Sequence, residues 1–312
     1  MSAMAFMATP SASPSRAANR VMGSIIAARR SSRLGYNSGM EPRLPRPDGE
    51  RLGAMVALVL LASGLSRIVQ LPAVEAEFGL LGLLVRLRLD TQFVMLTLAA
   101  GLAFTGVDWL LQSHPLAAQA RPGLDHRLIP GLGALGLGAI LARLPAGFPL
   151  AVGLGVAGLL LYGIFAAEFV VFDPEDPRAS WVGLGLRTLS FLLLVGVAFA
   201  IRAARVRAAF AIPLVSLATA AVVWRILVLH SGTADRRAAA YAAATAWVVG
   251  QLAWALHYWP GPPLRMALLL GAVAYAGTGL GRSQLTRAGR AGKVVEQAVV
   301  ASLALIATLA LT

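Results

Sequence analysis

Apolar stretches about as long as a bilayer is thick recur along the chain, and short loops rich in Arg, Pro and Asp separate them. A helix needs about 20 apolar residues to cross the hydrocarbon core of a membrane. Each stretch therefore predicts a membrane-spanning helix, and together they predict an all-α, polytopic transmembrane helix bundle. The expected spans, about nine, cover residues 52–71, 92–112, 128–144, 148–172, 181–201, 209–229, 238–258, 264–280 and 294–312.

The segment between the first two spans departs from this pattern. Residues 74–90 have an apolar middle that is too short to cross a bilayer, with charged residues on both sides. Such a composition predicts one interfacial helix that lies on the membrane surface. The flanking charges are Glu75, Glu77, Arg86, Arg88 and Asp90.

The composition supports a membrane class. Hydrophobic residues make up 58% of the 312 and charged residues 13%, so a water-soluble fold would lack the polar atoms to cover its surface. The length suits one membrane domain. The absence of cysteine excludes disulfides, thiolate metal sites and a cysteine nucleophile.

The first 39 residues differ from the rest of the chain. They contain five arginines, no acid and no apolar run long enough to span a membrane. This composition is similar to that of an organellar transit peptide. The simpler interpretation is a disordered N-terminal tail or a mis-assigned start, with translation beginning at Met40. The transmembrane helical domain then comprises residues 40–312.

The net charge of +13 comes almost entirely from arginine, since Lys293 is the one lysine. A basic chain can indicate nucleic-acid binding, but basic loops in an apolar chain record topology, so no nucleic-acid partner is expected. We expect the chain to lie in a bacterial cytoplasmic membrane with its N-terminus inside and its C-terminus outside. This orientation places three basic groups on the cytoplasmic side. These groups are Arg121 with Arg127, Arg236 with Arg237, and the set Arg282, Arg287, Arg290 and Lys293.

One basic loop disagrees with this orientation. Arg202, Arg205 and Arg207 would lie outside. A re-entrant segment within residues 209–229 would remove the conflict.

Two glycine patterns match the dinucleotide-binding fingerprint letter for letter, at Gly131-x-Gly133-x-x-Gly136 and Gly153-x-Gly155-x-x-Gly158. The fingerprint requires a strand before the glycines and a helix that starts at them, whereas these glycines lie inside apolar spans. They indicate close helix packing, and the same holds for Gly277 and Gly281.

Charged residues within the spans need partners, because each costs at least about 2.5 kcal/mol at the centre of a membrane. The candidates are Arg67, Asp108, Glu168, Arg187, Arg225 and His257. The chosen topology puts four of them in the cytoplasmic leaflet. We expect an intramembrane polar cluster in which carboxylates pair with guanidinium groups, formed by Asp108, Glu168, Arg187 and Arg225.

Two interpretations of this cluster remain open. It lines a cytoplasm-facing cavity for an ion, a proton relay or a polar headgroup, or it is a structural clasp between helices. Further polar residues are expected on the same side, without the spacing of a metal motif, so neither a metal nor a cofactor is expected. They are His114, Asp125, His126, Asp173 and Arg178.

The seventh expected span carries aromatic and polar residues on one face, at helical spacing. Trp247, Gln251, Trp254 and His257 form this possible ligand face for a quinone, lipid or pigment. The alternative is interhelical packing together with an interfacial aromatic belt.

Two stretches carry a family resemblance. Residues 105–115 (TGVDWLLQSHP) and 167–178 (AEFVVFDPEDPR) resemble a bacterial family of uncharacterised multi-pass membrane proteins. The resemblance extends from Met40 to the end and implies no activity. It singles out Asp108, His114, Glu168, Asp173 and Arg178.

No complete catalytic constellation is recognisable, so no catalytic residue is assigned. The leading hypothesis is a non-enzymatic accessory or scaffold component, with membrane lipids and other membrane subunits as partners. The alternative is a transporter of a small solute or ion, or a membrane enzyme that uses the cytoplasm-facing cluster on a lipid or isoprenoid substrate.

Overall fold

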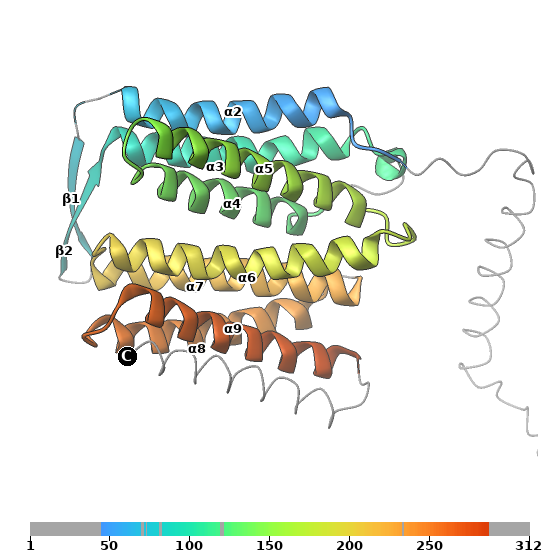
Figure 1. Ribbon diagram of the computed structural model, residues 1–312. Coiled ribbons are helices and arrows are strands. Elements are labelled where there is room, and N and C mark those ends of the chain that lie inside the picture. Colours follow the sequence, from blue (N-terminus) through green and yellow to red (C-terminus); the bar gives the residue numbers. More distant parts are fainter. Residues whose placement is uncertain are drawn as a thin grey trace, which may run out of the picture. The chain divides into compact units, whose positions relative to one another are not determined.

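The computed structural model describes residues 45–69, 72, 74–80, 83–118, 122–232 and 234–286. Within them, α-helices dominate, joined by short loops, together with one β-hairpin and a short 3-10 helix (Figure 1). The α-helices are α2 (Gly49–Ile68), α3 (Thr91–Leu111), α4 (Asp125–Leu141), α5 (Phe148–Val171), α6 (Ala179–Ala203), α7 (Ala208–Ser231), α8 (Arg236–His257) and α9 (Pro263–Thr286).

The helical class expected from the sequence is confirmed, whereas nine spans are not. Seven of the described helices are long and apolar enough to cross a membrane. The helix below that length is α4, with 17 residues. The expected span over residues 294–312 and the expected N-terminal tail lie outside the described residues.

The interfacial helix expected over residues 74–90 is wrong. This segment forms an antiparallel hairpin of β1 (Val74–Leu80) and β2 (Leu83–Leu89). The register sets Glu75 opposite Arg88 and Glu77 opposite Arg86. Charged and apolar residues alternate here with a period of two, which fits a strand and not a helix, and opposite charges across a ladder favour the pairing.

The re-entrant segment considered for residues 209–229 is also wrong, because α7 is one continuous helix of 24 residues. The loop with Arg205 and Arg207 therefore lies at the same end of the bundle as the hairpin (Figure 1). We call this the hairpin end; it also carries loops 142–147 and 258–262. The opposite end, which we call the polar end, carries the start of α2, loops 112–124, 172–178 and 232–235, and the end of α9.

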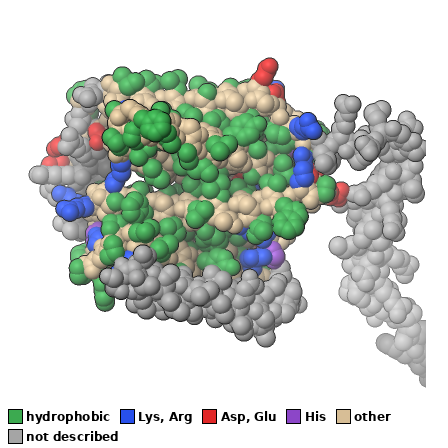
Figure 2. Space-filling model, viewed as in Figure 1, with side chains coloured by type: hydrophobic (Ala, Val, Ile, Leu, Met, Phe, Trp, Pro, Cys, Tyr) green, Lys and Arg blue, Asp and Glu red, His purple; other side chains and the backbone are tan. Residues whose placement is uncertain are grey.

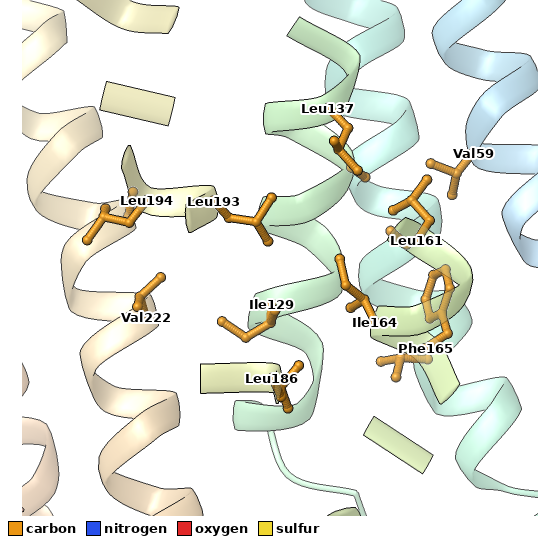
Figure 3. Close-up of a cluster of buried hydrophobic side chains, with 14 of the residues drawn as sticks. Val59, Ile129, Leu137, Leu161, Ile164, Phe165, Leu186, Leu193, Leu194 and Val222 are labelled. Atoms are coloured by element: carbon orange, nitrogen blue, oxygen red, sulfur yellow. The ribbon is translucent and has the colours of Figure 1, made fainter. Parts of the chain in front are cut away.

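Helix α4 lies at the centre of the packing and contacts α2, α3, α5, α6 and α7. Ile129 and Leu137 of α4 point into the main apolar core beside Leu161, Ile164 and other buried side chains (Figure 3). Glycine permits this close approach: a Cβ on Gly133 would lie 2.9 Å from Ile164 Cδ1. The glycines of both fingerprint-like patterns lie inside α4 and α5, as the packing interpretation requires.

At the hairpin end, arginine side chains donate hydrogen bonds to carbonyl oxygens in the last turns of neighbouring helices. Arg67 of α2 donates to the carbonyl oxygens of Leu141 and Ala142, at the end of α4. Arg143 donates to the carbonyl of Ala200 near the end of α6. A cation at a helix C-terminus satisfies carbonyls that have no partner within the helix and interacts favourably with the helix dipole.

On the face of the bundle that Figure 2 shows, apolar side chains predominate along the helices and charged ones gather toward the two ends. Large exposed residues include Leu159, Leu192 and Leu217. In water this surface would favour aggregation, whereas in a bilayer it faces lipid.

Candidate functional site

Arg225 is the centre of a buried polar cluster that joins three helices. Its Nε lies 3.2 Å from Glu168 Oε1, and one terminal nitrogen donates to the other oxygen of the same carboxylate. Its second terminal nitrogen lies 2.8 Å from Asp125 Oδ2. The cluster therefore ties α7 to α5 through Glu168 and to α4 through Asp125, and the bond to Glu168 has the forked geometry of a strong guanidinium–carboxylate pair.

His126 completes this cluster, which we call the Arg225 cluster: Asp125, His126, Glu168 and Arg225. The Nδ1 atom of His126 lies 2.9 Å from Glu168 Oε2 and 3.0 Å from a terminal nitrogen of Arg225. Its ring packs edge-on against Phe172, with the centroids 5.3 Å apart. The side chain of Glu168 is 0% exposed and that of Arg225 2%, so water does not satisfy these charges and the partners must.

Asp108 and Arg187, expected in one cluster with Glu168 and Arg225, lie elsewhere. Asp108 of α3 pairs with Arg127 of α4, with Arg127 Nε 2.8 Å from Asp108 Oδ1. This second pair is about a quarter exposed and lies at the polar end. The guanidinium of Arg127 also lies over the ring of Phe104.

Arg187 of α6 makes no hydrogen bond or ion pair with the residues that the structure describes. Its Nε is shielded from solvent without a partner. The like charge of Arg282, on α9, acts on it. A cation in this position within an apolar bundle calls for an anion.

A cavity of about 770 Å³ opens at the polar end and reaches the Arg225 cluster. Asp125, His126, Arg187 and Arg225 line it, together with Asp176 and residues of the loop between α5 and α6. Glu168 lies behind these groups and does not line the cavity. Charged side chains thus line part of the cavity, and Glu168 is separated from it by its partners His126 and Arg225.

The loop between α5 and α6 holds a third paired carboxylate. Asp176 is buried, and Arg178 Nε lies 3.1 Å from its Oδ1. Hydrogen bonds from Arg178 hold the pKa of Asp176 below its ordinary value, and the same pair raises the pKa of Arg178. Arg178 also donates to the carbonyl oxygen of Pro45, so this pair fixes the chain ahead of α2.

His114 is buried where α3 ends. Its ring packs edge-on against Phe169 and Phe172, and its Nδ1 accepts the backbone N–H of Leu116 at 3.2 Å. Burial lowers the pKa of His114 below its ordinary value, although the charges of Asp173 and Asp176 act in the opposite direction. A neutral ring with Nδ1 as acceptor fits both observations.

We predict that mild acid destabilises the protein through His114. The unfolded chain takes up a proton near pH 6.5, and the folded chain resists it, so this contribution is fully present above that pH and is lost as the pH falls below it. The melting temperature in detergent should fall between about pH 7.5 and pH 5.5. The fall should be smaller in His114→Asn, whose side-chain oxygen can still accept the N–H of Leu116.

The matched control is His257→Asn, at the hairpin end, which should keep the pH dependence of the wild type. An equal fall in the wild type and in His114→Asn would contradict the assignment.

The aromatic face expected on α8 points outward. Trp247 is 70% exposed and Trp254 54%, and Gln251 is also exposed. His257 packs edge-on against Tyr258, with Trp259 next in the chain at the same end. These side chains therefore point away from the other described helices.

The sequence analysis did not predict that Arg127 pairs with Asp108. It also did not predict that Asp125 and His126 join Glu168 and Arg225 in one cluster. The expected third span began at residue 128, which left these residues in a loop, whereas α4 begins at Asp125. An acid in a first helical turn is a known start signal and was the available clue. Among the described residues, no group of three His, Asp or Glu side chains is arranged to hold a metal ion.

A family model described as "Protein of unknown function (DUF5656)" matches residues 71–311. It confirms the expected resemblance to an uncharacterised family. No curated protein and no solved structure matches the chain.

Proposed function

We propose that this chain, which belongs to the DUF5656 family, is a non-enzymatic accessory or scaffold component of a membrane. One observation carries the proposal. Each buried carboxylate that the structure describes, at Asp125, Glu168 and Asp176, is bonded to an arginine. A carboxylate whose oxygens are engaged in this way is a poor base and a poor cation ligand, but it fixes the spacing of helices.

We place this component in a bacterial cytoplasmic membrane with its N-terminus inside, in contact with lipids and with other membrane subunits. The basic residues before α2 support this orientation, because cytoplasmic segments carry an excess of arginine. The chain has no native cysteine, so a Ser113→Cys variant reports the polar end directly. Labelling of that cysteine by an impermeant maleimide in intact cells would contradict the orientation.

The cavity at the polar end favours a second function. Asp125, Glu168 and Arg225 together carry one net negative charge when His126 is neutral, and three of these four groups line the cavity. A proton or a small cation would neutralise the cluster. The second candidate is therefore an ion or small-solute transporter, or a membrane enzyme that binds a lipid or isoprenoid headgroup there.

Reconstitution separates the two functions. The full chain would be inserted into liposomes that contain a pH-sensitive dye, and a pH step or a potassium diffusion potential would be applied. A scaffold predicts proton entry no faster than in protein-free vesicles, with and without Na⁺. A transporter predicts faster entry that depends on the Arg225 cluster.

The variant that distinguishes a scaffold from a transporter is the triple substitution Arg225→Met, Glu168→Met and Asp125→Asn. It removes the charges of Asp125, Glu168 and Arg225 together. For a scaffold, this variant retains the membrane subunits that copurify with the wild type in mild detergent. Flux through the wild type that the folded triple variant lacks would overturn the scaffold proposal.

A further inference from the structure

A lateral groove of about 550 Å³ lies between α6, α7 and α9. Its apolar wall includes Leu184, Phe191, Leu192 and Val195 of α6. Leu184 is 52% exposed and Leu192 63%, so the groove opens on the side of the bundle and not only at its end. Such a groove suits an acyl chain that enters from the bilayer.

Two arginines lie where the groove approaches the polar end. Arg187 of α6 and Arg282 of α9 both line it, and they are close enough for their charges to act on one another. Residues 187 to 195 of α6 span about 12 Å at 1.5 Å per residue. The groove thus combines two basic side chains toward the polar end with a largely apolar wall.

None of the described residues that line the groove is acidic. The hydroxyls of Thr188 and Thr278, which also line it, donate to carbonyl oxygens of their own helices. The buried carboxylates nearby, Asp125 and Glu168, are engaged by Arg225. Arg187 therefore remains a partly buried cation without an anion.

We propose that this groove binds an anionic phospholipid. The phosphate accepts charge-assisted hydrogen bonds from Arg187 and Arg282, and one acyl chain lies along the apolar wall of α6. Basic pockets between transmembrane helices bind anionic headgroups by the same chemistry. Arg187 also lines the cavity that reaches the Arg225 cluster, but no member of that cluster lines the groove, so the lipid proposal does not rest on the scaffold function.

Native mass spectrometry of the full chain tests the site, with dioleoylphosphatidylglycerol and dioleoylphosphatidylcholine as probes in parallel titrations. The wild type should retain the anionic lipid at least about tenfold more tightly than the zwitterionic one. Arg187→Gln should weaken retention of the anionic lipid by about tenfold or more, because a charge-assisted bond to phosphate is lost.

Three further variants sharpen the result. Arg236→Gln removes the same charge from an exposed position at the same end and should change little. Thr188→Trp fills the groove and should reduce retention without altering any charge. Arg187→Lys keeps the charge, so it tests the site even if Arg187→Gln does not fold.

Four results would overturn the proposal. They are equal retention of the two lipids, equal retention by Arg187→Gln and the wild type, inorganic phosphate binding as tightly as the anionic lipid, and absence of any lipid adduct on the wild type.

Discussion

Replacing Arg225 by methionine should lower the free energy of unfolding by about 3–5 kcal/mol, the largest effect expected for a single substitution in this chain. The change leaves two carboxylates, Asp125 and Glu168, close together without their shared cation. Both are buried, so water cannot replace the lost partner and the two charges repel. Thermal unfolding in detergent, followed by tryptophan fluorescence, measures the loss.

Comparison with other variants identifies the cause. Glu168→Gln leaves Arg225 paired with Asp125 and should cost less than Arg225→Met. Arg236→Met removes an exposed arginine at the same end and should stay within about 0.5 kcal/mol of the wild type.

The triple variant with Arg225→Met, Glu168→Met and Asp125→Asn should recover most of the stability lost by the single change. Replacing a complete buried ion network by apolar groups is often neutral, whereas removing one member is not. If the triple variant is no more stable than Arg225→Met alone, the loss comes from packing and not from unpaired charge.

The members of the Arg225 cluster were predictable only in part. Glu168 and Arg225 stand out in the sequence because each interrupts an apolar span, and a charge in that setting needs a partner. Which partner it finds depends on helix rotation and on where helices begin. The three-residue difference in the start of α4 brought Asp125, His126 and Arg127 into the bundle, where Arg127 takes the Asp108 that had been assigned to the common cluster.

The hairpin shows the opposite case, in which the sequence held a signal that was misinterpreted. Residues 74–89 are apolar enough to suggest a surface helix, yet their charges recur every second residue, at Glu75 and Glu77 and again at Arg86 and Arg88. On a helix this spacing would scatter the charges around the axis, whereas on a strand it gathers them on one face. The period, and not the average hydrophobicity, distinguishes the two structures.

The packing of α8 against α9 depends on a glycine whose substitution should also be costly. A Cβ on Gly277 would lie 2.5 Å from Thr245 Cγ2 and 2.8 Å from its Oγ1. Thr245 is buried and β-branched, and its hydroxyl donates to the carbonyl of Tyr241 one turn earlier, so it cannot rotate away freely. Gly277→Ala should therefore force the helices apart and destabilise the protein by about 1–3 kcal/mol.

The matched control is Gly155→Ala on α5, where a Cβ meets nothing within 4 Å. There the substitution should be neutral or stabilising by up to about 1 kcal/mol, because alanine favours a helix over glycine. Adding Thr245→Ala to Gly277→Ala removes the two nearest atoms and should make the double variant more stable than Gly277→Ala alone, as measured by thermal unfolding in the same detergent. Equal stability of Gly277→Ala and Gly155→Ala would show that α8 and α9 do not depend on this contact, since only the first position has a neighbour that the new methyl group would strike.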